Sequence, residues 1–239
     1  MKLLTSNSKV EKEASQHGYL VLAHQWAPGK LSGHEVCSHR GDCFKTCIYS
    51  AGKGKFPVVE RARITRTSLY FGNQKFYVEE LLTRELQNAV TRAGKAKLSL
   101  AVRLNTYSDW PWETRHRNLF DAFPDVQFYD YTKNPARARK YGQWLQGEIS
   151  EKRWPRNYHL TYSWSEKSTP VATRNLLDKG VNVARVGEPE GEWWNEYVWR
   201  DGDEHDMTFL HPQRSVLILK PKGDALSPAG IHNNKFLEA

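Results

Sequence analysis

The sequence predicts a mainly parallel α/β fold, which we expect to be either a partial (β/α)6 barrel or an open sheet. Six short segments are rich in β-branched and aromatic residues, and helical stretches lie between most of them. Strands that alternate with helices form parallel β-α-β units, because a parallel pair needs a long crossover connection. The six predicted strands are residues 18–27, 98–104, 126–131, 158–162, 181–186 and 215–219.

Five segments have the pattern of helices. Residues 57–72 begin with Pro57, which suits the first turn of a helix, and end with Gly72, which suits its stop. Residues 75–93 place apolar side chains at helical spacing and are followed by Gly94. The other predicted helices are residues 115–122, 135–146 and 169–177.

We expect a single domain over residues 1–239, with a core at about 18–220 and flexible termini, because no linker divides the chain. Residues 187–208 are an acidic, tryptophan-rich insertion. Within it, residues 193–199 suit one arm of a peripheral hairpin, and Asp201-Gly202-Asp203 suits its turn. A lid over the functional site is the alternative for this insertion.

Charge and hydropathy limit the classes of function. The formal net charge of +8 favours a polyanionic partner, such as a nucleic acid or a nucleotide. No run approaches the roughly 18 apolar residues that a membrane helix needs, and the first nine residues lack the apolar centre of a secretory signal. We therefore expect a cytoplasmic protein without a membrane partner, in the host cytoplasm if a phage encodes it. The sequence leaves the oligomeric state open.

The three cysteines of the chain, Cys37, Cys43 and Cys47, lie within eleven residues and directly after the first predicted strand. Thiolates are soft ligands that favour iron–sulfur clusters or zinc. We predict one metal site, with the sulfur atoms within about 4 to 7 Å of one another. Gly41 would supply the permissive backbone for the turn between them. In a closed zinc site, His34 or His39 would be the fourth ligand.

Polar residues follow the predicted strands, and the carboxyl ends of parallel strands meet at one edge of a sheet, where ligands bind. Carboxylates and amides at this edge suit catalysis or cofactor binding, although Asx and Ser side chains also cap helices. The predicted catalytic residues are Asp109, Asp130, Asn105 and Glu166, and the predicted cofactor-binding residues are Asn105, Ser108 and Ser163.

Three arginines at helical spacing, Arg61, Arg63 and Arg66, suit a positive surface that leads nucleic acid toward the cysteines. A solvated helix face without a ligand is the alternative.

A cysteine triplet in the loop after the first strand of a six-unit β/α chain resembles the radical S-adenosylmethionine enzymes, over about residues 18–220. The resemblance implies a partial barrel, a [4Fe–4S] cluster on Cys37, Cys43 and Cys47, and S-adenosylmethionine as the cofactor on the fourth iron. The cysteine spacing here is five and three residues, where that family has three and two, and its Gly-Gly-Glu motif is missing after the second strand.

Several segments also resemble a bacteriophage family of proteins named gene product 88. They are Cys-Ile-Tyr-Ser-Ala-Gly-Lys-Gly from residue 47, Val-Arg-Leu-Asn from residue 102, Phe-Tyr-Asp-Tyr-Thr-Lys from residue 128 and Leu-Thr-Tyr-Ser from residue 160. This resemblance implies a phage origin and supplies no activity.

The leading hypothesis is an enzyme of the radical S-adenosylmethionine type that acts on a nucleotide or a nucleic acid. A second hypothesis is a barrel that resembles the DNA-guanine transglycosylases, with Asp109 or Asp130 as the nucleophile and a structural zinc. The third is a non-enzymatic, zinc-stabilised protein that binds DNA or inhibits the host.

Overall fold

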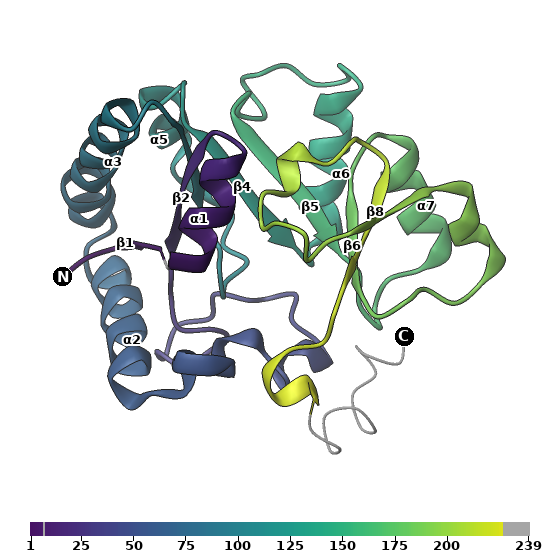
Figure 1. Cartoon of the computed structure of the whole chain (residues 1–239), viewed down its shortest axis with the longest axis horizontal. Helices are drawn as coiled ribbons and strands as arrows, with labels where there is room; N and C mark the ends of the chain where they lie inside the picture. Colours follow the sequence, from purple (N-terminus) through teal and green to yellow (C-terminus); the bar gives the residue numbers. More distant parts are fainter. Residues whose placement is uncertain (7, 227–239) are drawn as a thin grey trace.

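The computed structural model describes residues 1–6 and 8–226, and it has an α/β fold with an open, mostly parallel sheet of eight strands. Figure 1 shows the whole chain. The strands are β1 (Leu4–Thr5), β2 (Tyr19–His24), β3 (Ser99–Arg103), β4 (Gln127–Thr132), β5 (Tyr158–Ser163), β6 (Val183–Val186), β7 (Val198–Asp201) and β8 (Ser215–Leu219). All six predicted strands are present, and β1 and β7 are additional.

The strand order is β1-β2-β3-β4-β5-β6-β8-β7, and β1, which pairs with β2, is antiparallel to its neighbour. From β2 to β6 each strand pairs in parallel with the next strand of the chain. Right-handed crossovers between such strands place the connecting helices on one face of the sheet. The other face is left for different elements to cover.

The helices are α1 (Ser8–Gln16), α2 (Pro57–Gly72), α3 (Thr83–Lys95), α4 (Trp112–Arg115), α5 (Arg117–Ala122), α6 (Pro135–Leu145) and α7 (Pro170–Asp178), with a π-helix, η4, at Phe76–Leu82. Residues 57–72 form α2 with the predicted bounds. The predicted helix at 75–93 is instead η4 followed by α3, and the one at 115–122 is α4 followed by α5.

The two faces of the sheet are packed differently. One face packs against α3, α5, α6 and α7 in the larger core, which contains Leu22, Val102 and Phe128. On the other face a smaller cluster of Val21 and Tyr129 packs against α1 and against the segment at Met207. We call this second face the inner face. In Figure 1 α1 lies across it near β2.

The acidic insertion does not form a hairpin, which corrects the prediction for residues 187–208. It contains a 3-10 turn, η5 (Glu192–Glu196), and then β7, which pairs with β8 in parallel. The chain after β7 returns over the inner face, with η6 (Thr208–Leu210) against β4 and β5, before β8 begins. Met207 is buried there, and Phe209 packs edge to face on Tyr129. The insertion therefore fills part of the inner face.

The N-terminal residues are part of the core. Leu3 and Leu4 are buried, and their N–H groups donate to the Glu85 carboxylate on α3 at 2.6 and 2.8 Å. The C-terminal residues 227–239, for which flexibility was predicted, lie outside the described residues. Within the described part of the chain, no helix is long and apolar enough to cross a membrane.

Candidate active site

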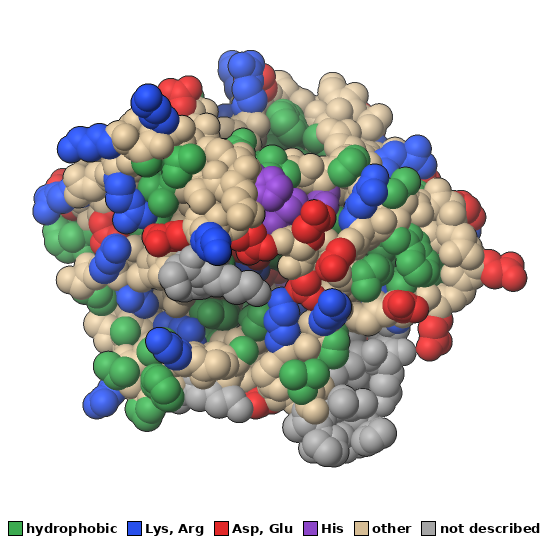
Figure 2. Space-filling model, viewed as in Figure 1, with side chains coloured by type: hydrophobic (Ala, Val, Ile, Leu, Met, Phe, Trp, Pro, Cys, Tyr) green, Lys and Arg blue, Asp and Glu red, His purple; other side chains and the backbone are tan. Residues whose placement is uncertain are grey.

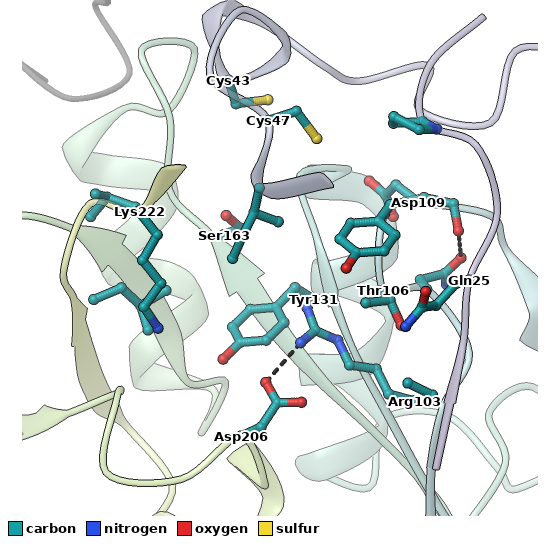
Figure 3. A pocket seen from close by; sticks show the side chains of 18 of the residues that line it. Gln25, Cys43, Cys47, Arg103, Thr106, Asp109, Tyr131, Ser163, Asp206 and Lys222 are labelled. Atoms are coloured by element: carbon teal, nitrogen blue, oxygen red, sulfur yellow. Dashed lines mark hydrogen bonds and ion pairs between the residues drawn. The ribbon is translucent and has the colours of Figure 1, made fainter. Parts of the chain in front are cut away.

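A cavity of about 600 Å³ occupies the carboxyl half of the inner face. The residues that line it come from the connection between β2 and α2, from the ends of β3, β4 and β5, and from the segments at 202–206 and 219–225. Figure 3 shows Cys43 and Cys47 above the cavity and Arg103, Tyr131 and Asp206 at its floor. A cavity at this edge is the expected ligand site of a parallel sheet.

All three cysteines line this cavity. The Cys37 thiol donates to the Tyr107 carbonyl oxygen at 3.4 Å. The pKa of Cys37 is raised to about 12, mainly by burial, with smaller contributions in the same direction from Asp109, Cys47 and Cys43 and a backbone hydrogen bond at Gly29 opposing them. Burial also raises the pKa of Cys47, with Cys43 adding to the effect. The neighbouring thiols thus disfavour the thiolate forms of Cys37 and Cys47, and a bound cation would reverse this preference.

The cysteine segment, residues 28–56, is held across the cavity by the loop after β5. Glu166 Oε1 accepts the Asp42 N–H at 3.1 Å, and Lys167 Nζ donates to the Arg40 carbonyl at 2.8 Å. A Cβ on Gly41 would lie 1.7 Å from Glu166 Oε1. Gly41 has φ −123° and is not left-handed, so glycine is needed here for the approach of Glu166 and not for a turn.

The predicted metal ligands fit a metal by their chemistry and their common cavity, but they are not arranged as a finished site. Among the described residues, no three His, Cys, Asp or Glu side chains form a metal-binding group. His34 stacks on Phe71 and His39 is exposed next to Ser38, so neither is placed as a fourth ligand. The Oε2 atom of Glu166 is buried without a hydrogen-bond partner. The donor set is therefore three soft thiols that face a cavity.

Asp109 lines the cavity, but its carboxylate is fully engaged. It accepts hydrogen bonds from the Thr132 hydroxyl at 2.7 Å and from the Lys133 N–H at 2.9 Å, and it pairs with Arg137. Arg137 also forms two hydrogen bonds with the buried Glu113 carboxylate. Asp109 thus joins the ends of β3 and β4, and a nucleophilic carboxylate would have to leave these partners.

Asp130 lies on the opposite face of β4 from the cavity and is fully buried. It accepts the Asn105 N–H at 2.6 Å and the Tyr158 hydroxyl at 2.8 Å. Burial raises the pKa of Asp130 to about 7, and these hydrogen bonds oppose the rise. The Asn105 side chain in turn accepts from Ser108 and from the Trp110 N–H. The structure places these three predicted residues in one hydrogen-bonded network that shapes the loop after β3.

Ser163 lines the cavity and accepts a hydrogen bond from Lys133 Nζ at 2.8 Å. Lys133 was not among the predicted site residues. Burial lowers the pKa of its ammonium, and Cys43, Asp109 and Glu166 act in the opposite direction. Lys133 therefore places its buried amino group beside the cysteines and the two carboxylates.

The helical arginines do not form the exposed surface that the sequence suggested, because α2 turns two of them inward. Arg63 is buried and donates to the carbonyls of Tyr49 and Gly54 in the cysteine segment. Arg66 is buried and donates to the Lys2 carbonyl at 2.9 Å. Arg61 alone of the three is exposed. Arg63 thus links α2 to the backbone of the cysteine segment.

Histidines gather in a hollow near the middle of the face shown in Figure 2. His205 stacks on His211 at 4.5 Å, and His17 meets His205 edge to face at 5.0 Å. Burial lowers the pKa of His211, and the neighbouring His205 adds to this. Burial, together with His211, also lowers the pKa of His159 on β5 to about 3. Burial on the inner face therefore favours the neutral forms of His159 and His211.

We predict that His159 makes stability depend on pH. Its folded pKa is lowered, so its contribution is fully present above the ordinary value of 6.5 and is lost as the pH falls toward 3. At pH 5 the loss is about 2 kcal/mol. Urea unfolding should show the stability gap between wild type and His159→Phe narrowing by about that amount from pH 7.5 to pH 5.

The control is Leu160→Ala, which truncates a fully buried apolar side chain next to His159 on β5 and removes no titratable group. Its cost should be equal at both pH values. A stability gap for His159→Phe that does not change with pH would contradict the prediction.

The fold and the cavity define an α/β protein with a candidate ligand site at the carboxyl edge of its parallel strands. The chain belongs to the Gene product 88 family, whose family model matches residues 1–236. This match confirms the sequence resemblance to that phage family, whereas the resemblance to radical S-adenosylmethionine enzymes stays a prediction. No curated protein and no solved structure matches the chain.

Proposed function

We propose that this protein is an enzyme that holds an iron–sulfur cluster on Cys37, Cys43 and Cys47 and uses it with S-adenosylmethionine to act on a nucleotide or a nucleic acid. The observation that carries the proposal is that the three cysteines, which are the only cysteines of the chain, line one cavity at the carboxyl edge of the sheet. The sequential order of β2 to β6 supports it, because a partial β/α barrel has the same order.

Three thiolate ligands and no placed histidine would leave one iron open toward the cavity. When bound, such a cluster supplies single electrons to its cofactor. The chain's own residues then have definite tasks. Lys133 places its amino group near Cys43 and Cys47, and thiolates there would favour its protonated form, which would offset their charge. Glu166 and Arg63 fix the segment that carries the cysteines, and the Asn105 network fixes the facing loop.

The transglycosylase hypothesis gains no support from these contacts. Asp130 lies outside the cavity lining, and Asp109 is held by three partners. The non-enzymatic zinc hypothesis needs a fourth ligand, and neither His34 nor His39 is placed to supply it.

The proposal predicts that protein purified without oxygen is brown and contains about four iron and four sulfide ions per chain. Iron and sulfide analysis and the visible absorption spectrum measure this directly. A colourless protein with one zinc ion per chain would overturn the proposal and return the site to the zinc alternative.

A further inference from the structure

Several exposed apolar side chains surround the mouth of the cavity. Phe44 and Ile48 line the cavity and are still 41% and 47% exposed. Phe44 rests directly against Gly29, where an added Cβ would meet its ring at 2.6 Å. Leu226 is 59% exposed at the end of η7 (Gly223–Leu226), which packs on η2 (Ile48–Ser50). We call this surface the rim; it consists of Arg40, Phe44, Lys45, Ile48, Lys220 and Leu226.

The rim lies in the basic part of the chain. Residues 28–61 and 219–226 contain eight lysines and arginines against four acidic residues, a net +4 out of the formal +8 of the whole chain. In Figure 2 the lower part of the face carries blue and green side chains, while red side chains gather toward the right. An apolar surface within a basic border favours a ligand that has both flat apolar groups and negative charge.

Arg40 gives the rim a planar platform. Its guanidinium lies over the Phe44 ring at 5.0 Å, where Glu35 pairs with it. Lys167 holds the backbone of the same residue through the Arg40 carbonyl. Nucleic-acid bases stack on guanidinium planes and aromatic rings, while lysines contact the phosphates.

The position of the cysteines favours a single strand over a duplex. A cavity of about 600 Å³ has room for a group of nucleotide size. All three cysteines line this cavity and are only partly exposed, so a base has to leave its stack to reach them.

We propose that the rim binds single-stranded nucleic acid, with the base that enters the cavity flanked by a neighbour stacked on Arg40. This inference extends the proposed function by naming its substrate. It relocates the nucleic-acid surface from the inward-facing arginines of α2 to the loops around the mouth.

The test measures the binding of a fluorescein-labelled 20-nucleotide DNA, as a single strand and as the matching duplex, by fluorescence anisotropy at 50 and 200 mM salt. We expect the single strand to bind at least about tenfold tighter than the duplex, because only its bases are free to stack. We expect binding to weaken at the higher salt, because phosphate contacts release counterions. Arg40→Met should weaken single-strand binding about tenfold by removing the stacking plane.

A matched pair of variants separates the rim from bulk charge. Lys45→Glu and Lys220→Glu in the rim, together with Lys222→Glu in the cavity lining, should weaken binding more than about tenfold at 50 mM salt, because phosphate contacts are lost. The control reverses three exposed lysines remote from the mouth, Lys75, Lys95 and Lys97, with the same change in net charge. It should weaken binding less than about threefold.

Equal weakening by both triple variants, or equal affinity for strand and duplex, would overturn the inference. So would the absence of any binding to the single strand. These binding measurements do not need the cluster. A brown, iron-loaded protein that binds no nucleic acid would refute the inference alone, and a colourless protein that binds single strands would refute the proposed function alone.

Discussion

Serine in place of Cys37, Cys43 or Cys47 should in each case reduce the iron bound by anaerobically purified protein to background. A hydroxyl is a hard and weakly acidic ligand, so it replaces a soft thiolate poorly. The fold should survive the change. The Cys37 thiol donates to the Tyr107 carbonyl, and a serine hydroxyl donates equally well. Iron analysis after gel filtration, with thermal unfolding of the metal-free proteins, measures the two effects separately.

Ser38→Ala is the matched control, because Ser38 is exposed next to Cys37 and its hydroxyl contacts the exposed His39. It should retain iron at the wild-type level. If one serine variant keeps its iron, that cysteine is not a ligand, and if all three keep it, the cysteines are not the chemical centre of the protein.

Local signals account for the parts of the fold that the sequence predicts well. The helix at residues 57–72 has the same bounds in the prediction and in the structure. The reason is that Pro57 and Gly72 each act on the single helical turn at their own end of the helix. β7 is different. Asp201-Gly202-Asp203 resembles a hairpin turn, but Met207 and Phe209 then fill the inner face, which forces a crossover to β8. The parallel pairing of β7 with β8 therefore depends on contacts with β4, which no local sequence pattern predicts.

The candidate site, like the fold, has parts that the sequence predicts and parts that depend on distant contacts. The rule that strand ends converge predicts the common cavity of the cysteine segment, Asp109 and Ser163. The alternation of side chains along β4 was the signal that could have refined the list of predicted site residues. It places Tyr131 and Lys133 on the cavity face and Asp130 on the helix face, so that Lys133 is the better candidate. Asp206 could not be found in this way, because it reaches the cavity only through the packing of the acidic insertion.

Arg63 and Arg66 show why a charge pattern in the sequence can predict a positive surface that the structure does not have. Spacing predicts that Arg63 and Arg66 share a face, but the sequence does not reveal whether that face is solvated. The backbone carbonyls of the cysteine segment and of Lys2 need donors, and these two side chains supply them. The two guanidinium groups consequently bind backbone carbonyls inside the protein and do not form part of an exposed positive surface.

Arg137→Ala should destabilise the protein far more than the same substitution at a partly exposed arginine. Arg137 is 6% exposed and forms hydrogen bonds with Glu113 Oε1 at 3.0 Å and Oε2 at 2.9 Å, and it also pairs with Asp109. Removing it leaves two buried carboxylates without their shared counter-ion, which typically costs about 3 to 5 kcal/mol. Equilibrium urea unfolding at pH 7 measures the loss.

Arg117→Ala is the control, since Arg117 pairs with the largely exposed Asp121 one turn further along α5, and it should cost less than about 1 kcal/mol.

Glu113→Gln should cost less than Arg137→Ala, because Asp109 still pairs with Arg137 and the glutamine carbonyl still accepts one hydrogen bond. Asp109 holds the Lys133 N–H and the Thr132 hydroxyl, so loss of Arg137 should also loosen the end of β4 that faces the cysteines. If Arg137→Ala costs no more than Arg117→Ala, then Asp109 and Glu113 are not held as buried charges, and the rigid wall that this network gives to the cavity does not exist.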